Sequence, residues 1–339
     1  MSQMRRVGAV GVVVSLALTA VASYGGPVSA ATVVTVATDG SGNFTTVQAA
    51  VNAAPAGGSG YEIDVKPGTY RGTVSIPSAK THVTLKGVGS GRDQVVIVEN
   101  HPASTYGTQG SATVAVSAND FRAENLTFAN DYDEAKNGSS QAVALDLNAD
   151  RAVLNNVRVL GNQDTLLLWT AGTGTVGRSY IRKSYVEGDV DFIFGRGTAV
   201  FDRTEIHSLS RGSSTNNGYV TAAATTDTNP YGLLFYRSTL TSDAQAKSVY
   251  LGRPWHPSGD AHAVGQVLFR ECTLGAHIRD DPWTDMSGFS WRSARFSEYA
   301  NTGAGAAVNA NRPQLSASQA PSYTPNAYLA GSDGWNPVF

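Results

Sequence analysis

The sequence has 339 residues, of which 27 are acidic, 25 basic and one, Cys272, is a cysteine. Beyond residue 30 there are 23 basic against 27 acidic residues, a formal net charge of −4 that argues against nucleic acid as a partner. The single cysteine excludes a framework of intrachain disulfides. No linker, charge run or low-complexity block divides the remainder, so one domain over 31–339 is predicted.

The first segment, 1–30, has the layout of a secretory signal peptide. Two arginines precede an apolar run over 7–22, and the segment ends in the small residues Val28-Ser29-Ala30. A membrane anchor is the alternative, but a span needs about 20 continuous apolar residues, and Ser15 and Thr19 interrupt this run. We therefore expect a secreted, extracellular protein without membrane attachment once the signal is removed.

A short helix is predicted next, over 45–53. Val47, Ala50 and Val51 fall on one face of it, and Pro55 follows its end. The rest of the chain consists of short β-rich runs separated by glycine-containing turns. The helix would cover the open N-terminal end of whatever these strands build.

Six of the β-rich runs are related to one another, since each has a small or polar residue in second place. These residues form the column Asn125, Asn156, Ser184, Thr204, Ser238 and Cys272. Their separations of 31, 28, 20, 34 and 34 residues indicate a solenoid with loops of variable length. A β-propeller would repeat every ~40 to 45 residues with its own signature. The pattern predicts an all-β, right-handed parallel β-helix with a short N-terminal capping helix, in which Cys272 is an interior residue.

Two aspartates stand at related places in this repeat. Asp164 comes eight residues after Asn156, and Asp191 comes seven after Ser184, so they should lie on consecutive coils. Neighbouring strands are about 4.7 to 4.9 Å apart, so the carboxyl groups would crowd each other on the outer face and raise one pKa. A protonated acid beside an ionised carboxylate suits acyl transfer. The alternative, that each aspartate only binds turn amides, is weakened by the apolar Phe192-Ile193-Phe194 that follows Asp191.

Arg253 and Trp255, in the segment 251–255, complete the candidate site. A guanidinium can hold a carboxylate ionised, and the indole offers a stacking face for a sugar, although both could belong to a structural cluster. The elbow of serine esterases, Gly-x-Ser-x-Gly, is absent, and the six histidines show no paired metal-ligand spacing. Neither a metal nor an organic cofactor is predicted.

These motifs together resemble pectin methylesterases, the carbohydrate esterases that demethylate homogalacturonan. The resemblance covers nearly all of the chain after residue 30. It rests on the segments 39–51, 66–70, 141–145, 161–166, 191–195, 251–255 and 298–303.

The resemblance implies a catalytic role for five residues. Asp191 would be the nucleophile on the methyl-ester carbonyl, and Asp164 the acid toward methanol and then the base toward water. Gln141 and Gln163 would donate hydrogen bonds to the oxyanion, and Arg253 would orient and ionise Asp191. The implied substrate is methyl-esterified homogalacturonan (pectin), bound by a monomer.

Three further residues are implied in substrate binding. Phe194 and Trp255 would line the sugar subsite, and Arg211 would face a free galacturonate carboxylate. Gly72 and Leu167 depart from the family pattern, which usually has glutamate and an aromatic residue at these places. The departures bear on substrate pattern and local packing more than on the reaction.

Two other functions remain open at the level of sequence. A pectate lyase can share the solenoid architecture, but it needs carboxylates clustered around calcium and a base to abstract a proton. A noncatalytic pectin-binding β-helix would use Trp255 and Phe194 to bind sugar and leave the aspartates idle.

Overall fold

The computed structural model describes residues 1, 32–170, 172 and 174–338. Apart from Met1, the predicted signal peptide over 1–30 lies outside the described residues. Within the described part, the strands form three parallel sheets of ten, eight and seven strands, named here sheets A, B and C. The chain passes from sheet A to B to C in each coil, as with β2, β3 and β4. The predicted right-handed parallel β-helix is confirmed.

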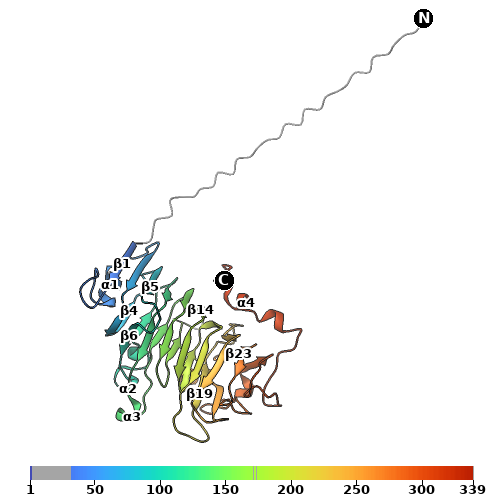
Figure 1. Cartoon of the computed structure of the whole chain (residues 1–339). Helices are drawn as coiled ribbons and strands as arrows, with labels where there is room; N and C mark the ends of the chain where they lie inside the picture. Colours follow the sequence, from blue (N-terminus) through green and yellow to red (C-terminus); the bar gives the residue numbers. More distant parts are fainter. Residues whose placement is uncertain (2–31, 171, 173, 339) are drawn as a thin grey trace. The chain divides into compact units, whose positions relative to one another are not determined.

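The strands of each sheet follow one another along the stack in Figure 1. In order of pairing, sheet A contains β1 (Thr32–Val36), β2 (Tyr61–Val65), β5 (Val83–Gly87), β8 (Arg122–Glu124), β11 (Ala152–Asn155), β14 (Arg178–Arg182), β17 (Thr198–Asp202), β20 (Leu233–Tyr236), β23 (Gln266–Arg270) and β25 (Arg295–Tyr299). Sheet B contains β3 (Gly68–Arg71), β6 (Val95–Glu99), β9 (Thr127–Asn130), β12 (Arg158–Leu160), β15 (Tyr185–Gly188), β18 (Glu205–Ser208), β21 (Thr239–Ser242) and β24 (Thr273–Leu274). Sheet C contains β4 (Val74–Ile76), β7 (Val114–Val116), β10 (Leu145–Leu147), β13 (Leu166–Leu168), β16 (Val190–Gly195), β19 (Gly218–Ala223) and β22 (Val249–Pro254).

Short helices lie in the connections between strands and in the segment after the last strand. They are α1 (Val47–Ala53), α2 (Ala103–Tyr106), α3 (Glu134–Asn137) and α4 (Pro325–Leu329), with the 3-10 turns η1 (Gln109–Ser111), η2 (Pro257–Gly259), η3 (Trp291–Ser293) and η4 (Ala320–Ser322). Among the described residues, no helix has the length and apolar character needed to cross a membrane.

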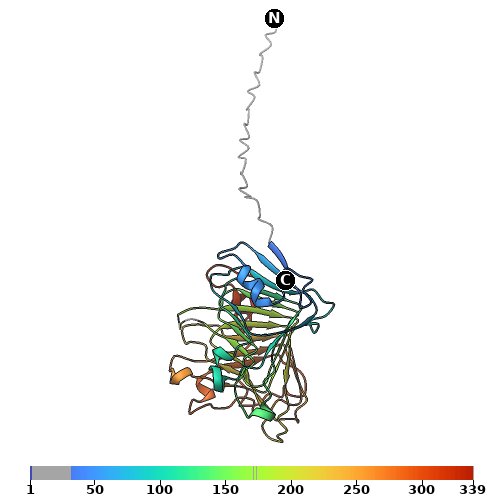
Figure 2. The ribbon, with the colours of Figure 1, turned by 90° about the vertical axis from the view of Figure 1, so that its left-hand side faces the viewer.

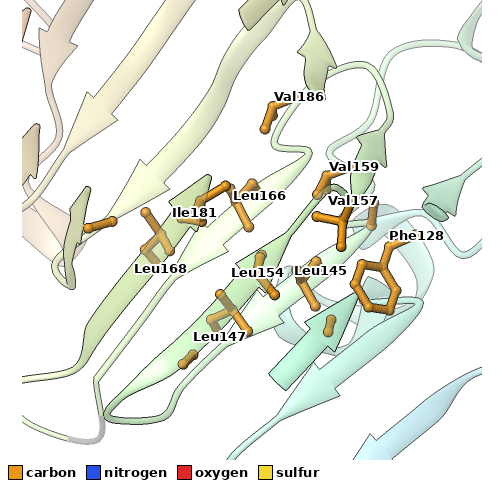
Figure 3. Packing of buried hydrophobic residues seen from close by; sticks show 14 of the residues in the cluster. Phe128, Leu145, Leu147, Leu154, Val157, Val159, Leu166, Leu168, Ile181 and Val186 are labelled. Atoms are coloured by element: carbon orange, nitrogen blue, oxygen red, sulfur yellow. The ribbon is translucent and has the colours of Figure 1, made fainter. Parts of the chain in front are cut away.

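Apolar side chains fill the interior of the coils, as Figure 3 shows for the middle of the solenoid. Val114, Leu145, Leu166 and Ile193 occupy partner positions on four successive coils and are fully buried. Each such side chain contributes roughly 1.5–3 kcal/mol by leaving water. Because strand neighbours alternate between the two faces, the outward positions of sheet C are free to carry other residues.

The predicted column of small residues mixes two structural columns, and this is a correction to the alignment. The register places Asn156 opposite Lys183, whereas Ser184 lies opposite Val157. One column has a left-handed φ near +50° and consists of Asn125, Asn156, Lys183, Arg203, Arg237 and Glu271. The next column is interior and consists of Leu126, Val157, Ser184, Thr204, Ser238 and Cys272.

The reason for the mixing is that each turn needs one residue with positive φ, which asparagine tolerates better than most residues. Asn156 is exposed there and donates from Nδ2 to Asn125 Oδ1 at 3.0 Å. Cys272 is interior as predicted, fully buried with its Sγ 3.3 Å from the Phe235 carbonyl. Burial raises the pKa of its thiol to about 12, which makes it unreactive.

The helix predicted over 45–53 is present as α1, which lies beside β1 at the blue end of the stack in Figures 1 and 2. The Thr46 hydroxyl caps it by accepting from the Ala49 backbone N–H at 3.2 Å. Val47, Ala50 and Val51 are buried in the core, and α1 contacts β1, β2 and β4. That α1 acts as a protective cap for the end of the solenoid stays a prediction.

At the other end of the chain, α4 covers the outer face of sheet A. Its Tyr328 and Leu329 are buried against outward residues of that sheet, among them Tyr180 and Leu234. The candidate site lies on the outer face of sheet C.

Candidate active site

Asp164 and Asp191 occupy equivalent positions on consecutive coils of sheet C. Asp164 precedes β13 and Asp191 lies in β16, and the pairing of Leu166 with Ile193 sets the two aspartates opposite each other. With the corrected register, each aspartate comes eight residues after the residue with positive φ in the turn from sheet A to sheet B, which is Asn156 in one coil and Lys183 in the next. The predicted neighbourhood of the two aspartates is therefore present.

Both aspartates have unusual backbone conformations. Their φ angles are +64° for Asp164 and +51° for Asp191, in the left-handed region that residues other than glycine rarely adopt. The ladder between β16 and β19 shifts register between Val190 and Ile193, which is an irregularity at Asp191 itself. Irregularities of this kind re-aim a side chain, and such strain is typically found where function requires it.

Arg253 reaches Asp191 from β22, two strands further along the sheet. Its Nε donates to Asp191 Oδ1 at 2.8 Å, and its Nη2 donates to Oδ2 at 2.6 Å. This is the two-pronged geometry of a strong, charge-assisted pair. It uses both carboxylate oxygens of Asp191.

The surroundings push the two carboxyl groups toward different protonation states. Burial raises the pKa of Asp191, but the Arg253 guanidinium opposes this rise. Burial raises the pKa of Asp164 well above its ordinary value, and the adjacent charge of Asp191 raises it further. Asp191 is consequently the group that ionises first, and Asp164 the one that keeps its proton.

A pocket of about 170 Å³ opens onto this pair. The predicted residues Gln141, Gln163 and Arg253 line it together with the two aspartates. Phe194 and Trp255 form an apolar wall of the pocket, with their ring centroids 5.6 Å apart. Seven of the eight residues predicted for the site therefore lie around one pocket.

The model of the pectinesterase family matches residues 33–332 of the chain. The chain belongs to the pectinesterase family. It is 39% identical over 312 residues to a pectinesterase of Ralstonia solanacearum, a match that covers 80% of this chain and 79% of the relative. It is 35% identical to pectinesterase A of Dickeya chrysanthemi over 87% of this chain and 88% of the relative.

Solved structures of pectin methylesterases are similar to it as well. One is pectin methylesterase PemA from Erwinia chrysanthemi, at a TM-score of 0.80 and 34% identity, covering 91% of this chain and 98% of that one. Another, a pectin methylesterase in complex with a hexasaccharide, has a TM-score of 0.81 at 35% identity, covering 90% and 98% of the two chains. The chain is an ester hydrolase with the pectinesterase fold.

Arg211 is the predicted site residue that this pectinesterase does not bring into the pocket. It lies in a neighbouring depression, where Nη1 is 2.8 Å from Asp189 Oδ2 and 3.5 Å from Glu134 Oε2. Asp189 of this depression is two residues before Asp191 on the chain, and its charge raises the pKa of Asp191. The guanidinium thus already faces two carboxylates of the protein.

Several residues of the site escaped the sequence analysis. Thr108 and Met286 line the pocket from irregular segments, where no local pattern indicates such a role. Tyr219 lies under Arg253, with its ring centroid 3.8 Å from the guanidinium carbon. Tyr219 pairs with Tyr250 in the ladder between β19 and β22. A sequence alignment of these two runs would have placed the two tyrosines side by side.

Two other sequence features have structural explanations. His256 donates from Nδ1 to the Asp260 carbonyl oxygen at 2.7 Å, and its ring stacks on Phe289 with the ring centroids 3.6 Å apart. Leu167 is buried in the apolar cluster that also contains Phe194. Among the described residues, no group of three or more histidine, cysteine, aspartate or glutamate side chains is placed to hold a metal ion.

Proposed function

We propose that this protein hydrolyses the methyl esters of galacturonate residues in pectin, with Asp191 as nucleophile and Asp164 as general acid and base. The observation that carries the proposal is the pair of buried carboxyl groups on consecutive coils, one of which is clamped by Arg253. Without this clamp, both groups would favour the protonated state. With it, the pair contains one nucleophile and one acid.

The reaction follows in two steps. An ionised Asp191 oxygen attacks the ester carbonyl carbon, and the Asp164 proton passes to the methoxy oxygen as that carbon–oxygen bond breaks and methanol leaves. The galacturonyl group is then joined to Asp191 as an anhydride. Ionised Asp164 takes a proton from water, whose oxygen attacks the galacturonyl carbon, and the breaking anhydride bond returns Asp191 as a carboxylate. The products are methanol and a free galacturonate carboxyl group.

Gln141 and Gln163 are proposed to stabilise the oxyanion that forms at each attack. Both side chains belong to the pocket that holds the aspartates. Amide N–H groups fixed in place before the reaction typically contribute about 10²–10³ in rate. No metal or organic cofactor takes part in this scheme.

An extended pectin chain is the proposed substrate. The similar pectin methylesterase solved with a hexasaccharide supports an oligosaccharide site of this kind. Phe194 and Trp255 provide an apolar wall for the sugar ring. Arg211 is proposed to contact a free galacturonate carboxylate. That carboxylate must compete with Asp189 and Glu134 for the guanidinium. If Arg211→Ala leaves the demethylation pattern unchanged, this role is wrong.

We also propose that the protein is secreted after cleavage near residue 30 and acts as a monomer. The support is the arrangement of charged, apolar and small residues over 1–30. The N-terminal residue of the exported protein, read by mass spectrometry, tests the cleavage, and light scattering after size exclusion tests the monomer.

The test of the reaction is methanol release from highly methylated pectin, with chelator present and the absorbance of unsaturated products followed in parallel. Methanol without unsaturated products, at the same rate with chelator, is the expected result. Unsaturated products that disappear with chelator would replace the proposal by a pectate lyase. Pectin binding without methanol would replace it by a noncatalytic β-helix.

A further inference from the structure

Arg253 is held on two sides, by Asp191 at its edge and by Tyr219 at its face. The guanidinium carbon lies 3.8 Å from the centre of the Tyr219 ring. Tyr219 in turn stacks on Tyr250, its register partner in β22, with ring centres 5.2 Å apart and planes inclined by 18°. The Arg279 guanidinium lies over the Tyr250 ring at 4.6 Å. The four side chains form a continuous column beside the pocket.

The column restricts a rotation that would break the contact between Arg253 and Asp191. Arg253 presents Nε and Nη2 to Asp191, so the plane of its guanidinium must stay aligned with the carboxylate. A ring packed on that plane opposes its rotation, both by contact and through attraction between the cation and the ring. The column is also anchored at its far end, because Arg279 Nη1 donates to the Thr215 carbonyl oxygen.

We propose that Tyr219, backed by Tyr250 and Arg279, is a positioning residue that keeps the Arg253 guanidinium aligned with Asp191. The inference rests on the proposed function, since it matters only if ionised Asp191 is the nucleophile. Tyr219 does not line the pocket and touches the reaction only through Arg253. The ring of Tyr219, and not its hydroxyl, holds the guanidinium in place, because the hydroxyl accepts a hydrogen bond from Asn216 Nδ2 at 2.9 Å.

Loosening the column has a specific consequence for pH. The titratable and charged groups around Asp191 are Asp164, Asp189, Arg253 and the Tyr219 phenol. Of these only Arg253 favours the ionised form of Asp191, against burial and the charge of Asp189. A misaligned Arg253 therefore lets the pKa of Asp191 rise, and the acid limb of the kcat profile moves to higher pH.

The test compares Tyr219→Leu with Tyr219→Phe in the full chain, using kcat and KM for methanol release across pH. Loss of the ring face is expected to lower kcat about tenfold, on the scale of one desolvated cation–π contact. KM should stay within about twofold, as expected when no substrate contact is lost. The acid limb should move to higher pH in the leucine variant, and the phenylalanine variant should restore both kcat and the limb.

Tyr236→Leu is the matched control. It removes a tyrosine under the Arg237 guanidinium on sheet A, at 4.7 Å, away from the outer face of sheet C. It is expected to leave the acid limb in place. Arg279→Gln provides a second test at the far end of the column, with a fall in kcat of about two- to threefold and a smaller limb shift in the same direction.

Three results would overturn the inference: an unshifted acid limb in Tyr219→Leu, a rise in KM in place of a fall in kcat, or equal behaviour of the leucine and phenylalanine variants. Each of these results would mean that Tyr219 only packs in the fold or contacts the substrate, and does not position Arg253. Asp191→Asn, assayed alongside, keeps the two proposals apart. If it is active, the proposed function fails; if it is inactive while Tyr219→Leu has the normal limb, only the positioning role fails.

Discussion

Two arginine–carboxylate pairs in this molecule have nearly the same geometry and very different surroundings. Arg312 donates from Nε and Nη2 to the two oxygens of Glu298 at 2.8 and 2.7 Å. Arg253 donates from the same two atoms to Asp191 at 2.8 and 2.6 Å. The Arg312 and Glu298 side chains are 1% and 2% exposed, whereas those of Arg253 and Asp191 are 20% and 7% exposed.

The two pairs differ in their other hydrogen bonds and in whether a ligand can reach them. We call Arg312 and Glu298 the closed pair, and Arg253 and Asp191 the open pair. In the closed pair, Asn301 also donates to Glu298, and Arg312 donates further to the Gly305 and Ala307 carbonyl oxygens. In the open pair, a second carboxyl group, Asp164, lies beside Asp191, and a pocket admits a ligand to both. The same ion pair is thus structural where every polar group is satisfied and reactive where one face is open.

Asp191→Asn should produce the largest effect, because it removes the proposed nucleophile and keeps the side-chain shape. We expect the kcat for methanol release to fall by at least about 10⁴-fold, the scale on which nucleophile removal acts. Asp164→Asn should come close to this. In Asp164→Asn the free energy of unfolding should not fall at pH 7, since burial raises the pKa of Asp164 and its ionised form costs stability there.

The check is single-turnover methanol release combined with urea unfolding of both asparagine variants. Near-normal rates in both would contradict the mechanism. A large loss of stability would show that the open pair also stabilises the fold, so that it would no longer differ from the Arg312–Glu298 pair in this respect.

Glu298→Gln should have the reverse profile. It leaves the Arg312 charge buried without its partner, so we expect the free energy of unfolding to fall by about 3–5 kcal/mol. The kcat of the molecules that remain folded should be unchanged. The double replacement Glu298→Leu with Arg312→Met should recover much of the stability, because no isolated charge remains. A kcat loss comparable to that of Asp191→Asn would break the comparison.

Much of this architecture could be predicted from local pattern. The repeated small residue after each turn indicated the solenoid, and the matching offsets of Asp164 and Asp191 indicated their adjacency. The one-residue error in the column arose because asparagine fills the left-handed position in two coils, while serine, threonine or cysteine fills the interior position in others. Both positions favour small or polar side chains, so composition alone could not separate them.

What could not be predicted depends on contacts between distant parts of the chain. Glu134 meets Arg211 across 77 residues of sequence, from a short helix in a connecting segment. Thr108 and Met286 reach the pocket from segments without periodicity. Their positions depend on how loops pack on the outer face of sheet C, and a repeat in the strands carries no information about that.

Gln163→Leu sharpens the comparison on the open side, since it removes an oxyanion donor and leaves both ion pairs intact. We expect kcat to fall by about 10²–10³-fold with little change in KM. The measurement is steady-state methanol release over a range of pectin concentrations that reaches saturation. A rise in KM at constant kcat would instead make Gln163 a residue that binds the ground state.

The smallest expected effect is on stability as a function of pH, and it arises from Asp164. Its pKa is raised in the folded protein, so the stability associated with its protonated form is present in acid and is lost as pH rises from the unfolded value toward the folded one. Asp164→Asn stays neutral and avoids this loss. The free energy of unfolding of the variant should therefore rise relative to that of the native protein as pH rises through this window, by at most about 1.4 kcal/mol per pH unit. Urea unfolding of the native protein and the variant from pH 4 to 8 measures this slope, and a gain by Asp164→Asn that shrinks as pH rises would mean that Asp164 stabilises the fold in its ionised form.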